Sequence, residues 1–129
     1  MLLIDLFFSY YPVFVPSLLC QTDRFDIEEH EDLREYRKPG QWKKHQPAVL
    51  LDGNRTNFQA CPELAERLLR TGDRPLAEAS PSDSICGIGL GPLDPRAQDP
   101  AQWRGLNLLG RVLETVRSEL RRAGADCSR

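Results

Sequence analysis

Histidine is scarce in this sequence, the cysteines lack paired spacing, and positive charge is not in excess. His30 and His45 are the only histidines and no C-x-x-C motif is present, so we expect no metal site. The four cysteines are interpreted as scattered reduced thiols of a cytoplasmic protein. The net charge of −2 gives no electrostatic indication of binding to nucleic acid or to an anionic membrane.

No lysine or arginine precedes Arg24, although residues 1–24 form an atypical apolar segment. A signal peptide needs a positive n-region, and a spanning helix needs about 20 apolar residues without breaks. Asp5, Pro12 and Pro16 interrupt this segment. Three interpretations stay open: a truncated or mis-spliced start of the domain, which we favour, a buried core segment, and a signal or anchor. We expect no stable membrane association.

The chain of 129 residues predicts one domain, placed at residues 25–123 and followed by a frayed tail at residues 124–129. The charged run at residues 25–36 suits a solvated surface helix. Asp52-Gly53-Asn54 predicts a helix end or a tight turn, because glycine adopts positive φ readily.

Two further helices are predicted from their boundary residues and apolar spacing. Pro62 suits the first position of a helix that Gly72 ends. Asp99 to Gln102 has the pattern of a capping box. After a turn near Gly105, Asn107 is the expected cap of the last helix, whose apolar face is Leu109, Val112, Leu113, Val116 and Leu120.

The central stretch, residues 71–90, reads TGDRPLAEASPSDSICGIGL. It predicts a helix exit, an extended segment at 75–79, a polar turn and a glycine-spaced apolar run. Glu78 interrupts the extended segment and Asp83 follows in the turn, as in many small polar ligand sites. Asp83 is equally suited to forming the turn itself. The glycine spacing matches neither G-x-G-x-x-G nor the Walker pattern, so close strand packing is its favoured use.

Several motifs here resemble the NADAR (YbiA-like) N-glycosidase family. The TGD, the E-A-S-P-x-D and the x-G-I-G-L of the central stretch resemble its signature, and PAQWRGLNLLG is similar to its W-x-G-x-N-x-L-G segment. Trp42, the Gly53-Asn54 pair and Phe58 stand where the family has a tryptophan, a G-N and a K-F. The resemblance covers about residues 42–120.

The resemblance implies a predominantly helical α+β domain, shortened at its N-terminus. The family's upstream S-E-H-Y-like motif, commonly assigned the main catalytic role, is not found. Glu29-His30 has different neighbours and lies too close to Trp42 to replace it. Cys86 stands where the family usually has the tryptophan of W-G-I-G-L.

The resemblance also implies hydrolysis of an N-glycosidic bond without metal or organic cofactor. The expected substrates are ribosylated pyrimidine intermediates of the riboflavin pathway or ADP-ribose adducts of nucleobases, so the ligand is a phosphoribosyl or ADP-ribose-type compound, including ADP-ribosylated nucleic acid. Such a reaction needs a carboxylate to stabilise an oxocarbenium-like state or orient water. Two alternatives stay open: a non-catalytic protein that binds these ligands, and a truncated gene product.

The implied site combines two carboxylates with four binding residues. Glu78 and Asp83 are the candidate catalytic groups. The expected binding residues are Trp42, which would stack on the base, Gly87 and Gly89, whose surrounding amides would hold an anion, and Asn107, which would hydrogen-bond the ribose or phosphate.

Overall fold

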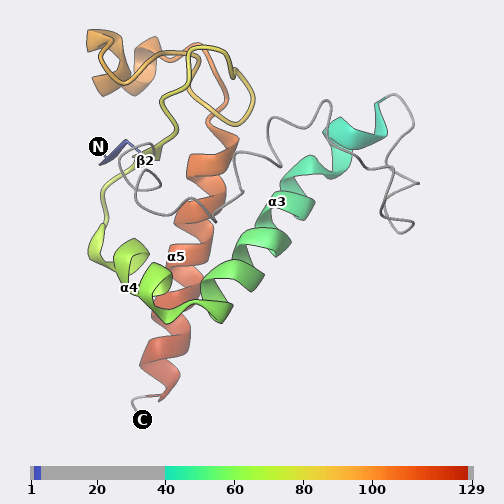
Figure 1. Ribbon diagram of the computed structural model, residues 1–129, viewed down its shortest axis with the longest axis vertical. Helices are drawn as coiled ribbons and strands as arrows, with labels where there is room; N and C mark the ends of the chain where they lie inside the picture. The colour runs from blue at the N-terminus through green and yellow to red at the C-terminus, as the bar shows by residue number, and fades with distance from the viewer. Residues whose placement is uncertain (1, 4–39, 128–129) are drawn as a thin grey trace.

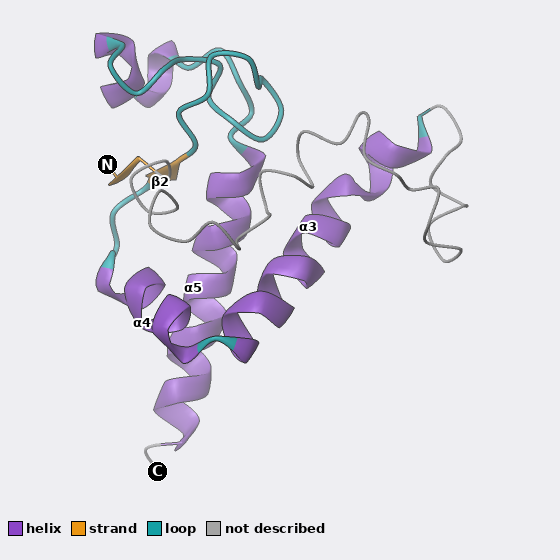
Figure 2. Ribbon diagram, viewed as in Figure 1, coloured by secondary structure: helices purple, strands orange, loops and turns teal. Residues whose placement is uncertain are grey.

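The computed structural model describes residues 2–3 and 40–127 (Figure 1). The helix predicted at 25–36 and nearly all of the apolar segment at 1–24 lie outside these residues. The elements in chain order are β1 (Leu2–Leu3), α3 (Gln41–Ala60), α4 (Pro62–Arg70), β2 (Leu76–Ala77), the 3-10 helices η2 (Pro95–Gln98) and η3 (Pro100–Gln102), and α5 (Leu108–Cys127). Helices dominate the described residues, as predicted, and strand is limited to one short pair (Figure 2).

Helix α3 begins directly after Gly40, whose backbone is left-handed with φ 86°. The helix end predicted at Asp52-Gly53-Asn54 is wrong, because α3 continues through these residues to Ala60. A glycine inside a helix costs about 1 kcal/mol, and burial of one face of α3 outweighs that cost. Side chains four residues apart share one side of a helix, and on α3 these buried residues are Gln46, Leu50, Asn54 and Phe58.

Helices α4 and α5 begin where the sequence predicts. Pro62 occupies the first turn of α4, and Gly72 follows the helix with φ 64°. Helix α5 begins after Asn107 and packs against both α3 and α4. It does not fray at Gly124, where a tail was predicted, but continues to Cys127.

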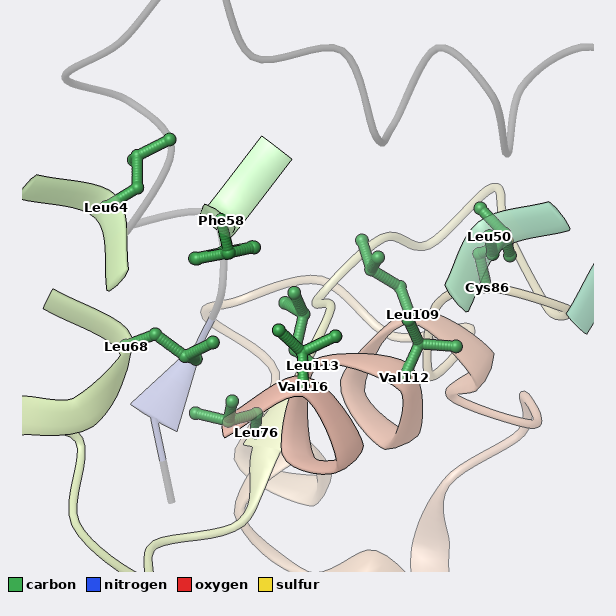
Figure 3. Close-up of a cluster of buried hydrophobic side chains, with 10 residues drawn as sticks. All are labelled: Leu50, Phe58, Leu64, Leu68, Leu76, Cys86, Leu109, Val112, Leu113 and Val116. Carbon is green, nitrogen blue, oxygen red and sulfur yellow. The ribbon is translucent and has the colours of Figure 1, made fainter. Parts of the chain in front are cut away.

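The main core cluster lies where α3, α4 and β2 meet α5 (Figure 3). The apolar face predicted for α5 supplies much of it. Its buried members are Leu50, Phe58, Leu64, Leu68, Leu76, Cys86, Leu109, Val112, Leu113 and Val116. A second, smaller cluster consists of Ala77, Ala79, Ile88, Leu90 and Ala97, with Trp103 packed against it.

Strand β2 lies between the two clusters and pairs with β1. The pairing is parallel, with Leu2 opposite Leu76 and Leu3 opposite Ala77. The extended segment predicted at residues 75–79 is therefore a strand for two residues only. Among the described residues, no helix combines the length and apolar character needed to cross a membrane.

Candidate functional site

Among the described residues, Glu78 is the only acidic side chain that is buried, with 6% of the residue exposed. It directly follows β2. Leu76 belongs to the main core cluster, whereas Ala77 and Ala79 belong to the second. Because alternate residues of an extended chain point to opposite faces, Glu78 lies on the same side as Leu76. The carboxylate therefore comes from a short strand that is packed on both faces.

The backbone of Glu78 is held by two later segments of the chain. Its N–H donates to Oδ1 of Asn107 at 3.1 Å. Its carbonyl accepts from the amides of Ile88 at 2.9 Å and Ser80 at 3.1 Å. The position of Glu78 is thus fixed through its own main chain, which limits where its carboxylate can reach.

Asn107 is buried and already occupied by the protein. It is 4% exposed, and besides accepting from Glu78 N, its Nδ2 donates to the carbonyl of Leu76 at 2.8 Å. It precedes α5 as predicted, but its side chain spans β2 instead of capping the helix. That this amide binds a ribose or phosphate remains a prediction. Such binding would compete with the two hydrogen bonds that Asn107 makes within the fold.

Asp83 organises the loop at residues 80–90, which we call the signature loop. Its Oδ1 accepts from the amides of Ile85 at 2.9 Å and Cys86 at 2.8 Å, and its carbonyl accepts from Gly89 N at 3.1 Å. This is the turn-forming role that the sequence left open. The other carboxylate oxygen, Oδ2, takes no part in that turn.

Gly87 is where the backbones of the two candidate carboxylate residues meet. A Cβ atom at Gly87 would lie 2.8 Å from the carbonyl oxygen of Asp83 and 3.0 Å from that of Glu78. The structure therefore brings the backbones of Glu78, Asp83 and Gly87 together, while the catalytic role of the two carboxylates remains a prediction. The amides of Ile88 and Gly89 already donate to the carbonyls of Glu78 and Asp83, so anion binding by amides at Gly87 and Gly89 remains a prediction.

A second loop, residues 103–107 (the tryptophan loop), packs directly on the signature loop. The amide of Leu106 donates to Ser84 O at 2.8 Å, and the amide of Gly105 donates to Ile88 O at 2.8 Å. A Cβ at Gly105 would collide with Gly87 O. The close packing predicted for the glycine run is real, but it joins two loops and not two strands.

Carbonyl groups of the signature loop also bind the amides at the start of α5. The amides of Asn107, Leu108 and Leu109 donate to the carbonyls of Gly87, Ile85 and Cys86 at 3.0, 3.0 and 3.1 Å. The first amides of a helix are a common anion site when they are unsatisfied. Here loop carbonyls satisfy them, so the end of the helix serves to hold the loop in place.

The capping box predicted at Asp99 is present in modified form. Asp99 Oδ1 accepts from the amide of Ala101 at 3.0 Å, as expected of a cap. Gln102 bonds the carboxylate of Asp99 through its side chain, and the element that follows is only the short η3. Trp103, next in the chain, donates from its ring nitrogen to Ala97 O at 2.9 Å, which fixes the tryptophan loop against the second cluster.

The Thr71-Gly72-Asp73 motif binds α5. Buried Arg117 donates to Thr71 Oγ1 at 2.7 Å, while Arg121 donates to Gly72 O at 2.5 Å and to Asp73 Oδ1 at 2.6 Å. Burial lowers the pKa of Arg117 below its ordinary value. All three residues of the motif are thus used to dock α4 on α5.

Cys86 is disulfide-bonded, and Cys61 is free. The expectation of reduced thiols throughout the chain is therefore wrong for Cys86. Its sulfur is completely buried and also lies 3.7 Å from Nε2 of Gln46. Helix α3 thereby packs against the signature loop at the position where the family usually has a tryptophan. Trp42 lies one turn before Gln46 in α3, and its stacking role remains a prediction.

Sequence reasoning missed two buried amides on α3. Gln46 is 4% exposed and Asn54 is 1% exposed. Asn54 donates from Nδ2 to Leu50 O at 2.8 Å, and within the described chain its Oδ1 has no hydrogen-bond partner. The four-residue spacing with Leu50 and Phe58 was the signal that could have revealed both amides as part of a buried face.

No group of three or more potential metal-ligating side chains occurs among residues 2–3 and 40–127. The site is instead a buried carboxylate beside a tightly bonded pair of loops. In this arrangement a helical frame fixes loop residues around one acidic group.

Comparison with known proteins identifies the family. The NADAR domain family model matches residues 20–121, so the chain belongs to this family. The resemblance read from the sequence begins at Trp42. The family model begins earlier, at residue 20, and so also includes the charged run at residues 25–36.

Three curated relatives share the central part of the chain. N-glycosidase R617 of Acanthamoeba polyphaga mimivirus is 44% identical over 81 residues, covering 63% of this chain and 48% of the relative. Protein irg-1 of Caenorhabditis elegans is 40% identical over 79 residues, covering 61% of this chain and 37% of the relative. N-glycosidase Npun_R5314 of Nostoc punctiforme is 34% identical over 80 residues, covering 62% and 44%. The matched segment thus spans less than half the length of each relative.

Proposed function

We propose that this chain is an N-glycosidase, or the part of one that carries the Glu78 site. Membership of the NADAR family and two relatives named N-glycosidases support a glycosidase-type function. The structural observation that carries the proposal is Glu78, an acidic side chain that is 6% exposed and backbone-fixed between β2 and the signature loop. A carboxylate held in a fixed position that is largely shielded from water is suited to the carboxylate role that N-glycoside hydrolysis needs.

In the proposed reaction Glu78 acts at the anomeric carbon of a ribosyl group. The bond between this carbon and the base nitrogen breaks, and its electron pair leaves with the base. Water bonds to the carbon, and its proton finally resides on the released base. The Glu78 carboxylate stabilises the developing positive charge or accepts the proton of the attacking water.

The remaining predicted residues take supporting roles in this proposal. Asp83 contributes Oδ2, because Oδ1 is committed to the loop. Trp42 stacks on the base, and the backbone around Gly87 and Gly89 holds the sugar phosphate. The substrates proposed are ribosylated pyrimidine intermediates of the riboflavin pathway and ADP-ribose adducts of nucleobases, the latter including ADP-ribosylated nucleic acid.

The proposal is tested by incubating the purified chain with a ribosylaminopyrimidine phosphate and with ADP-ribosylated DNA, and measuring released base or sugar by chromatography. Glu78→Gln keeps the shape of the side chain and removes its charge. We expect this variant to lose at least about 100-fold in rate, the usual scale for acid–base catalysis. Glu66→Gln, at an exposed position on α4, is the matched control and retains the wild-type rate.

Two outcomes would overturn the proposal. Equal rates for wild type and Glu78→Gln would show that the reaction does not depend on this carboxylate. Ligand binding without any product, measured by calorimetry on folded protein, would identify the chain as a non-catalytic binding protein.

A further inference from the structure

Strand β2 has different partners on its two edges. On one edge β1 pairs with it through the backbone. On the other edge, within the described residues, the partners are side chains of α5 and of the residue before it. Leu76 N donates to Oε1 of Glu114 at 2.8 Å, while Asn107 bonds both Leu76 O and Glu78 N. Asn107 thus replaces a peptide group of a neighbouring strand, because its amide offers one donor and one acceptor side by side.

The backbone of Asn107 is held in an uncommon conformation that serves this contact. Its φ is 51°, and among the described residues it is the only non-glycine with positive φ. Asparagine tolerates this region better than most residues. Its own N–H donates to Gly87 O, and its carbonyl accepts from Arg111 N at 3.1 Å. The loop and α5 therefore fix the backbone of Asn107 on both sides of the Cα from which its side chain reaches β2.

Gly110 leaves the space in which this contact forms. A Cβ there would collide with Leu76 O and would also lie too close to Nδ2 and Oδ1 of Asn107. By contrast, a Cβ at Gly124, in the same helix, would meet nothing within 4 Å. The missing side chain at Gly110 therefore leaves the room that the Asn107 amide and the Leu76 carbonyl need to meet.

We propose that Asn107 is a positioning residue for Glu78, and not a ligand-binding residue. This inference rests on the proposed function, since it gives Asn107 its effect through the Glu78 carboxylate. Both functional atoms of the Asn107 amide bond the backbone of β2 and Glu78, and the residue is 4% exposed. Glu78 N–H is one bond from the Cα that bears the catalytic side chain, so releasing it moves the carboxylate.

Steady-state kinetics on the full chain distinguish positioning from binding. We expect Asn107→Ala to lower kcat by about 10- to 100-fold, because small displacements of a reacting group have effects of this size, while KM stays within about twofold. A binding residue would instead raise KM and leave kcat unchanged, and that result would overturn the inference. In the Glu78→Gln background, Asn107→Ala should produce little further loss, since residues that act as a unit are not additive. An undiminished further loss would also overturn it.

Two additional variants separate positioning from general instability. Asn107→Asp retains an acceptor for Glu78 N–H and loses the donor to Leu76 O, so it should keep more of kcat than Asn107→Ala. Gly110→Ala should reproduce the loss of kcat, and Gly124→Ala should not. Equal losses in both glycine variants, or in both Asn107 variants, would contradict the proposal.

Amide hydrogen exchange followed by NMR tests the structural step without substrate. The Glu78 amide should be protected in wild type and should exchange faster in Asn107→Ala and, less so, in Asn107→Asp. The Arg104 amide, which donates to Ile88 O, should be unchanged. If wild type releases no base, the proposed function fails while this measurement still decides whether Asn107 fixes Glu78. An unprotected Glu78 amide in wild type would overturn the inference regardless of activity.

Discussion

The guanidinium of Arg117 donates to the hydroxyl of Thr71 at 2.7 Å, and both residues are buried. The same nitrogen donates to Arg74 O at 2.9 Å, and Thr71 Oγ1 also donates to Leu68 O at 2.6 Å. The threonine of the Thr71-Gly72-Asp73 motif therefore connects the end of α4 to the middle of α5.

Thr71→Val should destabilise the protein by about 1–3 kcal/mol, because it leaves a buried charged donor short of an acceptor. Urea unfolding measures the change. Thr56→Val, at an exposed position on α3, removes a comparable hydroxyl bond to Asp52 O and should stay within about 0.5 kcal/mol. A similar loss of unfolding free energy in both variants would show that the contact with Arg117 adds no stability beyond that of an exposed hydroxyl bond.

Gly105→Ala should destabilise the protein by about 1–3 kcal/mol or more, because its Cβ would overlap the backbone of Gly87 and Ile88. Gly91→Ala is the control, since a Cβ there meets nothing within 4 Å. Thermal unfolding of the two variants should differ clearly. A Gly105→Ala protein as stable as Gly91→Ala would mean that the two loops separate easily.

Leu113→Ala should cost about 2–5 kcal/mol, the range for a leucine truncated in a core. Leu113 is 1% exposed in the main core cluster, whereas Leu93 is 95% exposed. Leu93→Ala should therefore be nearly neutral in chemical denaturation. A neutral Leu113→Ala would contradict the packing of α5 described above.

Stability should fall in acid as carboxylates that bond arginines become protonated. Hydrogen bonds from Arg96 lower the pKa of Asp94 from 3.8 to about 2. Because the folded state lowers this pKa, the contribution to stability is complete above pH 3.8 and is lost as pH falls toward 2. Hydrogen bonds from Arg55 and Arg121 likewise lower the pKa values of Glu119 and Asp73.

Asp94→Asn tests this assignment, since it keeps an acceptor for Arg96 N and removes the titrating group. The urea midpoint of this variant should depend less on pH than that of wild type between pH 4 and pH 2. An identical pH dependence would show that Asp94 does not contribute.

Most helix boundaries could be predicted because local residues determine them. Pro62, Gly72 and Asn107 each mark an end through backbone geometry, and the structure confirms all three. The prediction at Gly53 was wrong because its local preference for a turn is overridden by burial of Leu50 and Phe58, which depends on segments distant in sequence.

The local features of the candidate site could be predicted from the sequence, but the contacts between distant residues could not. The turn-forming role of Asp83 was foreseeable from its place in a Ser-Pro-Ser-Asp turn, and the backbones of Glu78, Asp83 and Gly87 meet. The bond from Asn107 to Glu78 joins residues 29 positions apart, and no local pattern indicates whether a buried amide will bond a ligand or a strand. The disulfide at Cys86 was missed for a similar reason, since wide spacing in sequence says little about distance in space.

Because β2 bonds both β1 and Asn107, the region around Glu78 can form only after segments far apart in the sequence have met. One partner strand lies at Leu2–Leu3, and the other contacts come from Asn107 and Glu114. During synthesis Glu78 therefore leaves the ribosome well before its last supports do. Contacts between distant residues form slowly, so we expect the helices to fold first and the carboxylate to reach its final position only after Asn107 and Glu114 have been synthesised.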